Sequence, residues 1–304
     1  GSPSGQHVAR FIMASSSLYI DAPAKVNWHL QVVGRRSDGF HELLSCFVAL
    51  DLCDRVIAEV MPGAPKSCIQ LLSASPHGKH FPLDPSNLIM RAEKIWRESG
   101  GVAPPIAWSV EKNIPAQAGL GGASSDAAAA LMLLQDHASH RLPDSAIDHI
   151  ASLLGADVPF FLQSNSPALM AGRGDIFVSD IKLPAQWLVL AIPEFRIGTP
   201  EVFAELNAPD FTGAQVIEAK VRANPGPNQL FEPALAVEPL LNEFAAQLSQ
   251  IANFCMSGSG STMFAAFSEE DKANDCALSV NHLCKNVIVS QVIPGPVLSA
   301  AKSF

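Results

Sequence analysis

Closely spaced cysteines are missing from this chain. Its six cysteines are spread over 304 residues, and no two of them form a Cys-x-x-Cys pair. A disulfide framework or a zinc site would need such clustering. We therefore expect free thiols in a reducing compartment and no metal ion held by protein ligands alone.

Long apolar runs and an excess of basic residues are also missing. No run reaches the roughly 18 apolar residues of a membrane span, and residues 1–7 lack the features of a signal peptide. We expect no membrane partner, a cytoplasmic location, and an expression remnant over residues 1–13. The formal net charge of −9 argues against a nucleic-acid partner, because duplex binding needs dense Lys and Arg contacts.

What is present predicts an α+β chain of two domains, residues 14–181 and 182–304, with a cleft between them. In the first, hydrophobic periodicity predicts strands at 18–24, 27–33, 41–48, 54–60, 106–112, 168–171 and 175–178, and helices at 85–97, 126–139 and 144–154, with Ser86 as the cap of the first helix. In the second, it predicts strands at 187–192, 253–256, 262–267 and 286–292, and helices at 199–206, 237–250 and 269–282. The order of these elements predicts a split βαβ, ferredoxin-like unit, whereas residues 207–233 carry little pattern.

The segment at residues 115–125, PAQAGLGGASS, joins a predicted strand to a predicted helix. A glycine loop at a helix N-terminus favours phosphate binding, because the first helical N–H groups are free and the helix dipole is positive there. The segment is not a Walker A loop, since no lysine precedes Ser124 or Ser125, nor a Rossmann loop, since Ser124 replaces the third glycine. The alternative is a tight turn that only packs a helix against a sheet. The two serines can cap that helix or bind magnesium.

Several isolated polar residues each have a structural and a functional interpretation. Lys25 interrupts an apolar strand pattern, so it either extends into solvent at a sheet edge or acts in a site, with Asn27 on the same face. Asp157 precedes Val158-Pro159 and can cap a helix, accept a proton, or do both. The pair Phe40-His41 can serve packing or stack on a flat base. The glycine–serine segment at residues 257–261 can be a simple hairpin turn.

The order of these segments along the chain resembles that of the GHMP kinases. The glycine loop and residues 256–260 (MSGSG) mark that superfamily. Three further segments, PAKVN at 23–27, GRRSDGFH at 34–41 and GADVP at 155–159, are similar to the branch that phosphorylates a CDP-linked methylerythritol. The resemblance implies the two-domain GHMP kinase fold, with an N-terminal β/α ATP-binding domain, and implies ATP as co-substrate with Mg²⁺. It implies that Asp157 accepts the proton of the substrate 2-hydroxyl, while Lys25 orients Asp157 and offsets phosphoryl charge.

The resemblance also assigns binding residues. Those implied for ATP are Pro115, Ala116, Gln117, Ala118, Gly119, Leu120, Gly121, Gly122, Ala123, Ser124 and Ser125, together with Asn87 and Lys112. Those implied for the substrate are Asn27, His41 and Thr199, with Phe40 and Phe203 on the two faces of the cytosine ring, and residues 258–261 at the border of the site. Gln117-Ala118 stands where the family often has glycines, and Phe40 where it often has tyrosine.

Two alternatives remain open on the sequence. One is a related GHMP kinase acting on homoserine or mevalonate, which would not need the base-stacking set Phe40, His41 and Phe203. The other is a metabolite sensor without catalytic activity on the same fold, against which the presence of both Lys25 and Asp157 speaks. We expect a monomer or weak homodimer with a small-molecule substrate as partner.

Overall fold

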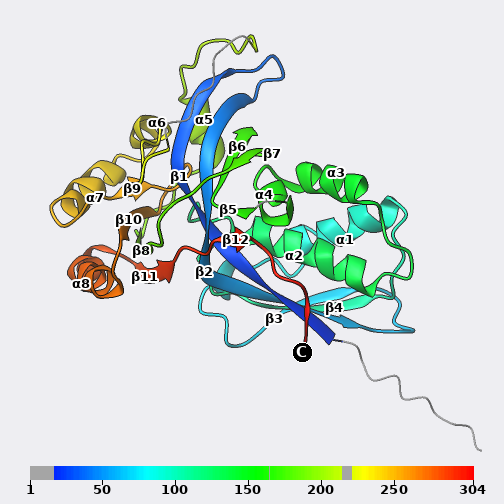
Figure 1. The fold of residues 1–304 in the computed structure, drawn as a ribbon. Helices are drawn as coiled ribbons and strands as arrows, with labels where there is room; N and C mark the ends of the chain where they lie inside the picture. The colour runs from blue at the N-terminus through cyan, green and yellow to red at the C-terminus, as the bar shows by residue number, and fades with distance from the viewer. Residues whose placement is uncertain (1–16, 164, 214–220) are drawn as a thin grey trace, which may run out of the picture.

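The computed structural model describes residues 17–163, 165–213 and 221–304. The predicted expression remnant at residues 1–13 lies outside these described residues. Two long antiparallel strands, β1 (Ser17–Arg35) and β2 (His41–Val60), run through the centre of the structure (Figure 1). The sequence divided each of them into two strands, and this was wrong. In β1 the apolar alternation is interrupted by three register shifts, and bulges of this kind bend a strand without ending it.

The larger sheet is built around these two strands. Its order is β13-β1-β2-β4-β3, and β6 pairs with both β2 and β7. The further strands are β3 (Cys68–Leu71), which the periodicity missed, β4 (Ile106–Glu111), β6 (Ala168–Gly172), β7 (Ile176–Asp180) and β13 (Lys302–Ser303). Strands β6 and β7 pair antiparallel across the turn at residues 173–175.

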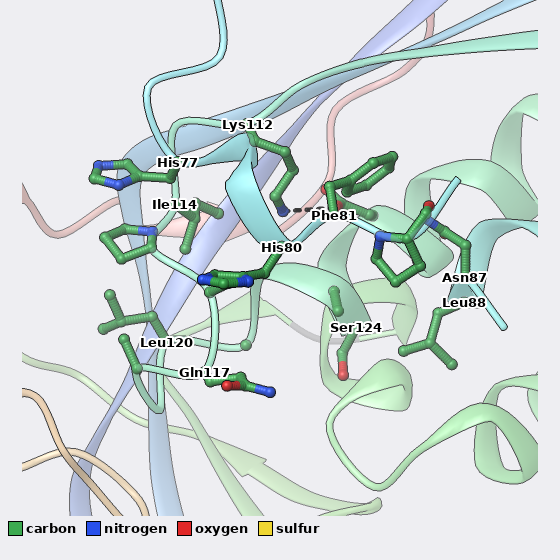
Figure 2. A pocket seen from close by; sticks show the side chains of 18 of the residues that line it. His77, His80, Phe81, Asn87, Leu88, Lys112, Ile114, Gln117, Leu120 and Ser124 are labelled. Carbon is green, nitrogen blue, oxygen red and sulfur yellow. Dashed lines mark hydrogen bonds and ion pairs between the residues drawn. The ribbon is translucent and has the colours of Figure 1, made fainter. Parts of the chain in front are cut away.

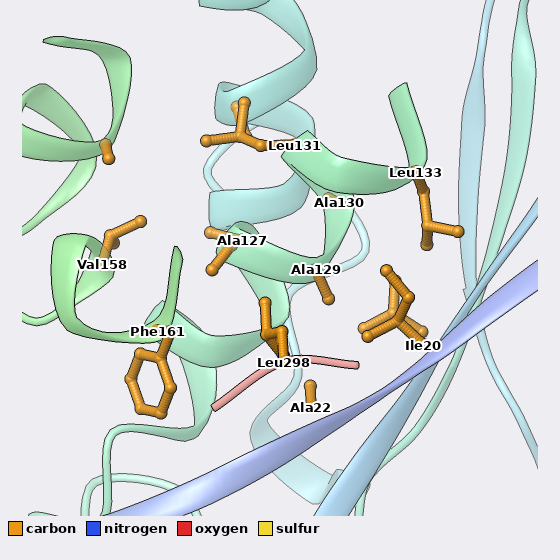
Figure 3. Close-up of a cluster of buried hydrophobic side chains, with 14 of the residues drawn as sticks. Ile20, Ala22, Ala127, Ala129, Ala130, Leu131, Leu133, Val158, Phe161 and Leu298 are labelled. Atoms are coloured by element: carbon orange, nitrogen blue, oxygen red, sulfur yellow. The ribbon is translucent and has the colours of Figure 1, made fainter. Parts of the chain in front are cut away.

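Four helices gather on one side of this sheet (Figure 1): α1 (Leu88–Glu98), α2 (Gly122–His137), α3 (Asp144–Leu154) and α4 (Val158–Gln163). Helix α2 lies between α4 and β1, where its alanines allow a close approach to Val158 and Ile20 (Figure 3). Two predicted helix starts were wrong. Asn87, rather than Ser86, caps α1, because its Oδ1 accepts a hydrogen bond from the Ile89 N–H at 2.9 Å. Helix α2 begins at Gly122 rather than at residue 126.

The second unit has the predicted ferredoxin-like arrangement. Its antiparallel sheet has the order β11-β8-β10-β9, formed by β8 (Trp187–Ile192), β9 (Cys255–Met256), β10 (Met263–Phe267) and β11 (Asn286–Gln291). Its helices are α5 (Thr199–Ala204), α6 (Phe231–Val237), α7 (Leu240–Ser249) and α8 (Glu270–Val280). The predicted helix over residues 237–250 was wrong at its start. The chain breaks at Glu238-Pro239 between α6, which the sequence did not predict, and α7.

The chain returns to the first sheet at its end. Strand β12 (Gly295–Pro296) pairs with β5 (Asn165–Ser166), and β13 pairs with β1. Two short 3₁₀ helices, Gly78–His80 and Asn281–Leu283, complete the described elements. A hydrophobic cluster that includes Trp28 and Phe264 joins the two sheets, so loops from both units meet at the site described below. The division at residue 182 stays a prediction. Among the described residues, no helix is both long and apolar enough to cross a membrane.

Candidate active site

The loop between β4 and α2 lines a cavity of about 380 Å³, together with the N-terminus of α1 and residues 77–82 (Figure 2). Gly119 and Gly121 adopt left-handed φ values of 74° and 72°. Gln117 also lies in this region, with a φ of 56°, at a position where the family often has glycine. Its Oε1 accepts a hydrogen bond of 2.6 Å from Arg196 Nη1. The sequence departure therefore keeps the glycine-like backbone and adds a contact to the second unit.

A buried acid–lysine cluster anchors this loop. Asp54 Oδ1 accepts hydrogen bonds from the Asn113 and Ile114 N–H groups at 2.6 and 2.9 Å. Lys112 Nζ lies between the carboxylates of Asp54 and Asp126, with 2.8 Å to the latter. Burial raises the pKa of Asp126, although the Lys112 ammonium opposes this. Lys112 lines the cavity as predicted, but its ammonium is engaged with these two acids.

The sequence did not single out Asp54 and Asp126 as partners of Lys112. The only signal was an acid inside an apolar strand pattern and another inside an alanine-rich helix. Asn87 lies on the opposite wall of the cavity. It caps α1 and donates its Nδ2 to the Pro82 carbonyl at 2.8 Å. Both predicted nucleotide-site residues outside the loop thus hold the cavity walls in place.

A second cavity, of about 280 Å³, contains Lys25 and Asp157. Lys25 Nζ lies 3.2 Å from Asp157 Oδ2 and donates to Asn27 Oδ1 at 2.8 Å. The interpretation of Lys25 as a solvent-exposed edge residue was wrong, since only 4% of it is exposed. Asn27 in turn donates to Ser45 Oγ at 2.9 Å. Lys25 is therefore fixed on one side by a chain of hydrogen bonds and points its ammonium at Asp157, which immediately precedes α4.

The first two cavities adjoin each other, because both are lined by Gly119, Gly121 and Ser124. The second unit closes the site from the other side. Ser257 Oγ donates to the Gly119 carbonyl at 3.0 Å, and the Asn27 N–H donates to Ser257 Oγ at 3.3 Å. Ser257 belongs to the segment at residues 256–260 that marks the superfamily, but no role of its own was predicted from the sequence. Its contacts bind the two units together at the glycine loop.

A third cavity, of about 680 Å³, has an aromatic lining that includes Phe40, His41 and Phe203. The ring centroids of His41 and Phe203 lie 5.6 Å apart, with an interplanar angle of 31°. His41 Nε2 is buried and has no hydrogen-bond partner among the described residues. Burial lowers the pKa of His41, which favours the neutral ring. Thr199 lines both this cavity and the Lys25 cavity.

The structure thus brings the predicted site residues together around three adjoining cavities. Ser125 is one exception, because its side chain is fully buried in α2 and its Oγ has no partner among the described residues. Of the predicted border segment 258–261, only Gly258 and Ser259 line these cavities. Arg173 was not predicted as a site residue, yet it lines two of the cavities. Its only sequence signal was its place between two glycines in a turn. Within the described residues, no cluster of three or more His, Cys, Asp or Glu could hold a metal ion.

Comparisons with known proteins find relatives over most of the chain. The family model "GHMP kinases N terminal domain" matches residues 87–165. A 4-diphosphocytidyl-2-C-methyl-D-erythritol kinase of Paramagnetospirillum magneticum is 34% identical over 86% of this chain and 93% of its own length. The kinase of the same name from Geotalea daltonii is 36% identical over 84% of this chain and 91% of its own.

Solved structures show the same relation. A crystal structure of 4-(cytidine 5'-diphospho)-2C-methyl-D-erythritol kinase matches with a TM-score of 0.71 and 32% identity, covering 90% of this chain and 98% of that one. A homoserine kinase from Cytophaga hutchinsonii matches with a TM-score of 0.60 and 16% identity, covering 97% of this chain and 99% of that one. This match shows a shared fold. The chain therefore belongs to the family of 4-diphosphocytidyl-2-C-methyl-D-erythritol kinases within the GHMP kinases.

Proposed function

We propose that this protein transfers the γ-phosphoryl group of ATP to the 2-hydroxyl of 4-diphosphocytidyl-2-C-methyl-D-erythritol, in non-mevalonate isoprenoid precursor biosynthesis. The observation that carries the proposal is the order of the three cavities. The glycine-loop cavity and the aromatic cavity each share lining residues with the cavity that holds Lys25 and Asp157. A phosphate donor on one side and a base-linked alcohol on the other would meet at these two side chains.

The chemistry at the centre needs a proton acceptor and a fixed positive charge. Asp157 accepts the proton of the attacking hydroxyl, because its carboxylate is partly exposed in the cavity where that hydroxyl would lie. Lys25, held by Asn27, orients the Asp157 carboxylate and offsets negative charge on the phosphoryl group in transfer. Phosphoryl transfer depends mostly on such positioning and electrostatics, so no covalent intermediate is required.

The ATP side supplies backbone N–H groups and a helix dipole. The first turn of α2 directs its free N–H groups toward the loop cavity, where they would bind phosphate oxygens. Mg²⁺ fits this site through the phosphates and the Ser124 hydroxyl, which lines both adjoining cavities, whereas Ser125 is too deeply buried to reach it. Bound there, the ion would neutralise charge on the phosphate oxygens.

On the substrate side, Phe40 and Phe203 offer ring faces to the cytosine, and His41 offers a ring nitrogen without a hydrogen-bond partner in the described part of the chain. This aromatic set is the feature that favours a CDP-linked substrate over homoserine or mevalonate. The proposal also includes a cytoplasmic location, the absence of a nucleic-acid partner, which the net charge of −9 supports, and a monomer or weak homodimer.

A coupled ADP-release assay tests this proposal with the CDP-linked substrate, homoserine and mevalonate offered in parallel. We expect turnover with the CDP-linked substrate alone and competitive inhibition by CMP. Asp157→Asn should lower kcat by about 10²–10⁴-fold, the range for loss of a general base, while Lys25→Ala should lower kcat without unfolding the protein. Turnover of homoserine or mevalonate in preference would assign the chain to a different kinase activity. Absence of ADP release with every alcohol would instead favour the sensor hypothesis.

A further inference from the structure

Arg173 lies where the Lys25 cavity meets the aromatic cavity. The two cavities share five lining residues, and Arg173 is the only charged one. The others are Leu43, Ala156, Thr199 and Phe203. A ligand with its base in the aromatic cavity and its reacting hydroxyl beside Asp157 must therefore pass the Arg173 side chain.

The guanidinium of Arg173 is held in a fixed orientation. Its Nε and Nη2 donate to Asp175 Oδ2 at 3.2 and 2.9 Å, and Nη2 also donates to the Ser152 carbonyl at 3.2 Å. The guanidinium carbon lies 5.1 Å from the centroid of the Phe40 ring. Because these contacts already order the side chain, little conformational entropy remains to be lost when a ligand binds.

The remaining edge of the guanidinium is available for a ligand. No hydrogen bond of Arg173 Nη1 is found among the described residues, and about 29% of the side chain is exposed. A planar guanidinium with free N–H donors suits the paired oxygens of a phosphate group. Asp175 offsets part of its charge, so the contribution comes from directed hydrogen bonds more than from long-range attraction.

We propose that Arg173 binds the diphosphate that links the cytidine and methylerythritol parts of the substrate. This inference rests on the proposed function and adds a residue that selects for the linker. Arg173 also stacks on Phe40. The side chain that binds the diphosphate therefore also contacts the ring against which the cytosine would lie. Arg173 is thus a substrate-binding residue that distinguishes a nucleotide-linked alcohol from a free alcohol or a nucleoside.

The experiment compares cytidine with CDP as competitive inhibitors of the enzyme. In the unchanged protein, CDP should bind much more tightly than cytidine. In Arg173→Gln this preference should shrink by about 10- to 100-fold, the range for loss of a charge-assisted hydrogen bond. The KM for the CDP-linked substrate should rise by a similar factor, whereas kcat and the KM for ATP should change by less than about threefold.

Two further variants keep the test decisive. Arg173→Lys retains the positive charge but loses the two parallel N–H donors of the guanidinium. It should therefore recover part of the preference for CDP over cytidine that Arg173→Gln loses. Arg141→Gln removes a surface arginine that pairs with Asp136 at 2.9 Å, away from the three cavities, and should leave all constants unchanged. Equal weakening of cytidine and CDP in the Arg173 variants would show a merely structural role and overturn the inference.

The outcomes also separate this inference from the proposed function. Turnover by the unchanged enzyme with an unaltered CDP preference in Arg173→Gln would refute the role of Arg173 alone. Lack of turnover in the unchanged enzyme, with a CDP preference that depends on Arg173, would refute the proposed reaction and leave the diphosphate contact standing.

Discussion

Replacement of Gly121 by alanine should disable the enzyme by moving Lys25. Gly121 lies at the N-terminus of α2 with a φ of 72°. A Cβ added there would lie 2.9 Å from Lys25 Cγ, 3.1 Å from Lys25 Cε and 3.0 Å from Phe161 Cζ. Phe161 is packed in the core and Lys25 Cγ is the nearest atom, so Lys25 is the group that must shift.

Two effects follow, and they can be separated. The left-handed conformation costs alanine about 1–2 kcal/mol relative to glycine. The displacement of Lys25 from Asp157 should lower kcat by about 10²-fold, since a shift of about 1 Å in a reacting group has an effect of that size. Gly63→Ala is the matched control. Gly63 has a φ of 86°, yet nothing lies within 4 Å of its added Cβ.

In urea titrations, both variants should lose unfolding free energy equal to the cost of the left-handed conformation, and Gly121→Ala should lose further unfolding free energy because its Cβ also meets Lys25 and Phe161. Only Gly121→Ala should lose turnover. The assay is ADP release at saturating ATP and substrate, so that weaker nucleotide binding does not mask the effect on kcat. A kcat for Gly121→Ala within threefold of that for Gly63→Ala would refute the argument. So would a large loss of turnover in Gly63→Ala.

Three further predictions concern the walls of the site. Asn87→Ala should lower the unfolding free energy by about 1 kcal/mol through loss of the α1 cap, while Asn87→Asp should retain most of it, as thermal unfolding can show. Asp54→Ala should lower the unfolding free energy in urea by about 3–5 kcal/mol. Lys112 would keep only one of its two acid partners, and two backbone N–H groups of the loop would lose their acceptor, so a loss below about 1 kcal/mol would contradict this. Burial lowers the pKa of His29, so the fold favours its neutral form. The contribution of neutral His29 to the unfolding free energy should be complete above about pH 6.5 and decrease as the pH falls below that value. His29→Phe should flatten the dependence of the unfolding free energy on pH in this range. An unchanged slope would contradict the role of His29.

The local pattern predicted most strands of the second unit correctly because each has a short apolar run bounded by turn residues. It failed where β1 continues through Lys25 and Val26, between the two predicted strands. Polar residues inside a buried strand look like a break in the sequence, but the structure supplies them with partners across the sheet. The return of the last strand to β1 was equally invisible, since two residues carry no periodicity.

The sequence by itself determined the glycine loop before a helix, the order of the family segments and the ferredoxin-like pattern of the second unit. These depend on neighbouring residues, through turn preference, helix dipoles and hydrophobic periodicity. Only the tertiary structure decided that Lys112 is engaged with Asp54 and Asp126, that Gln117 adopts the glycine-like conformation, and that Arg173 stands between two cavities. The reason is physical. Such contacts join side chains from separate elements, so their geometry exists only once the two sheets and their helices have packed.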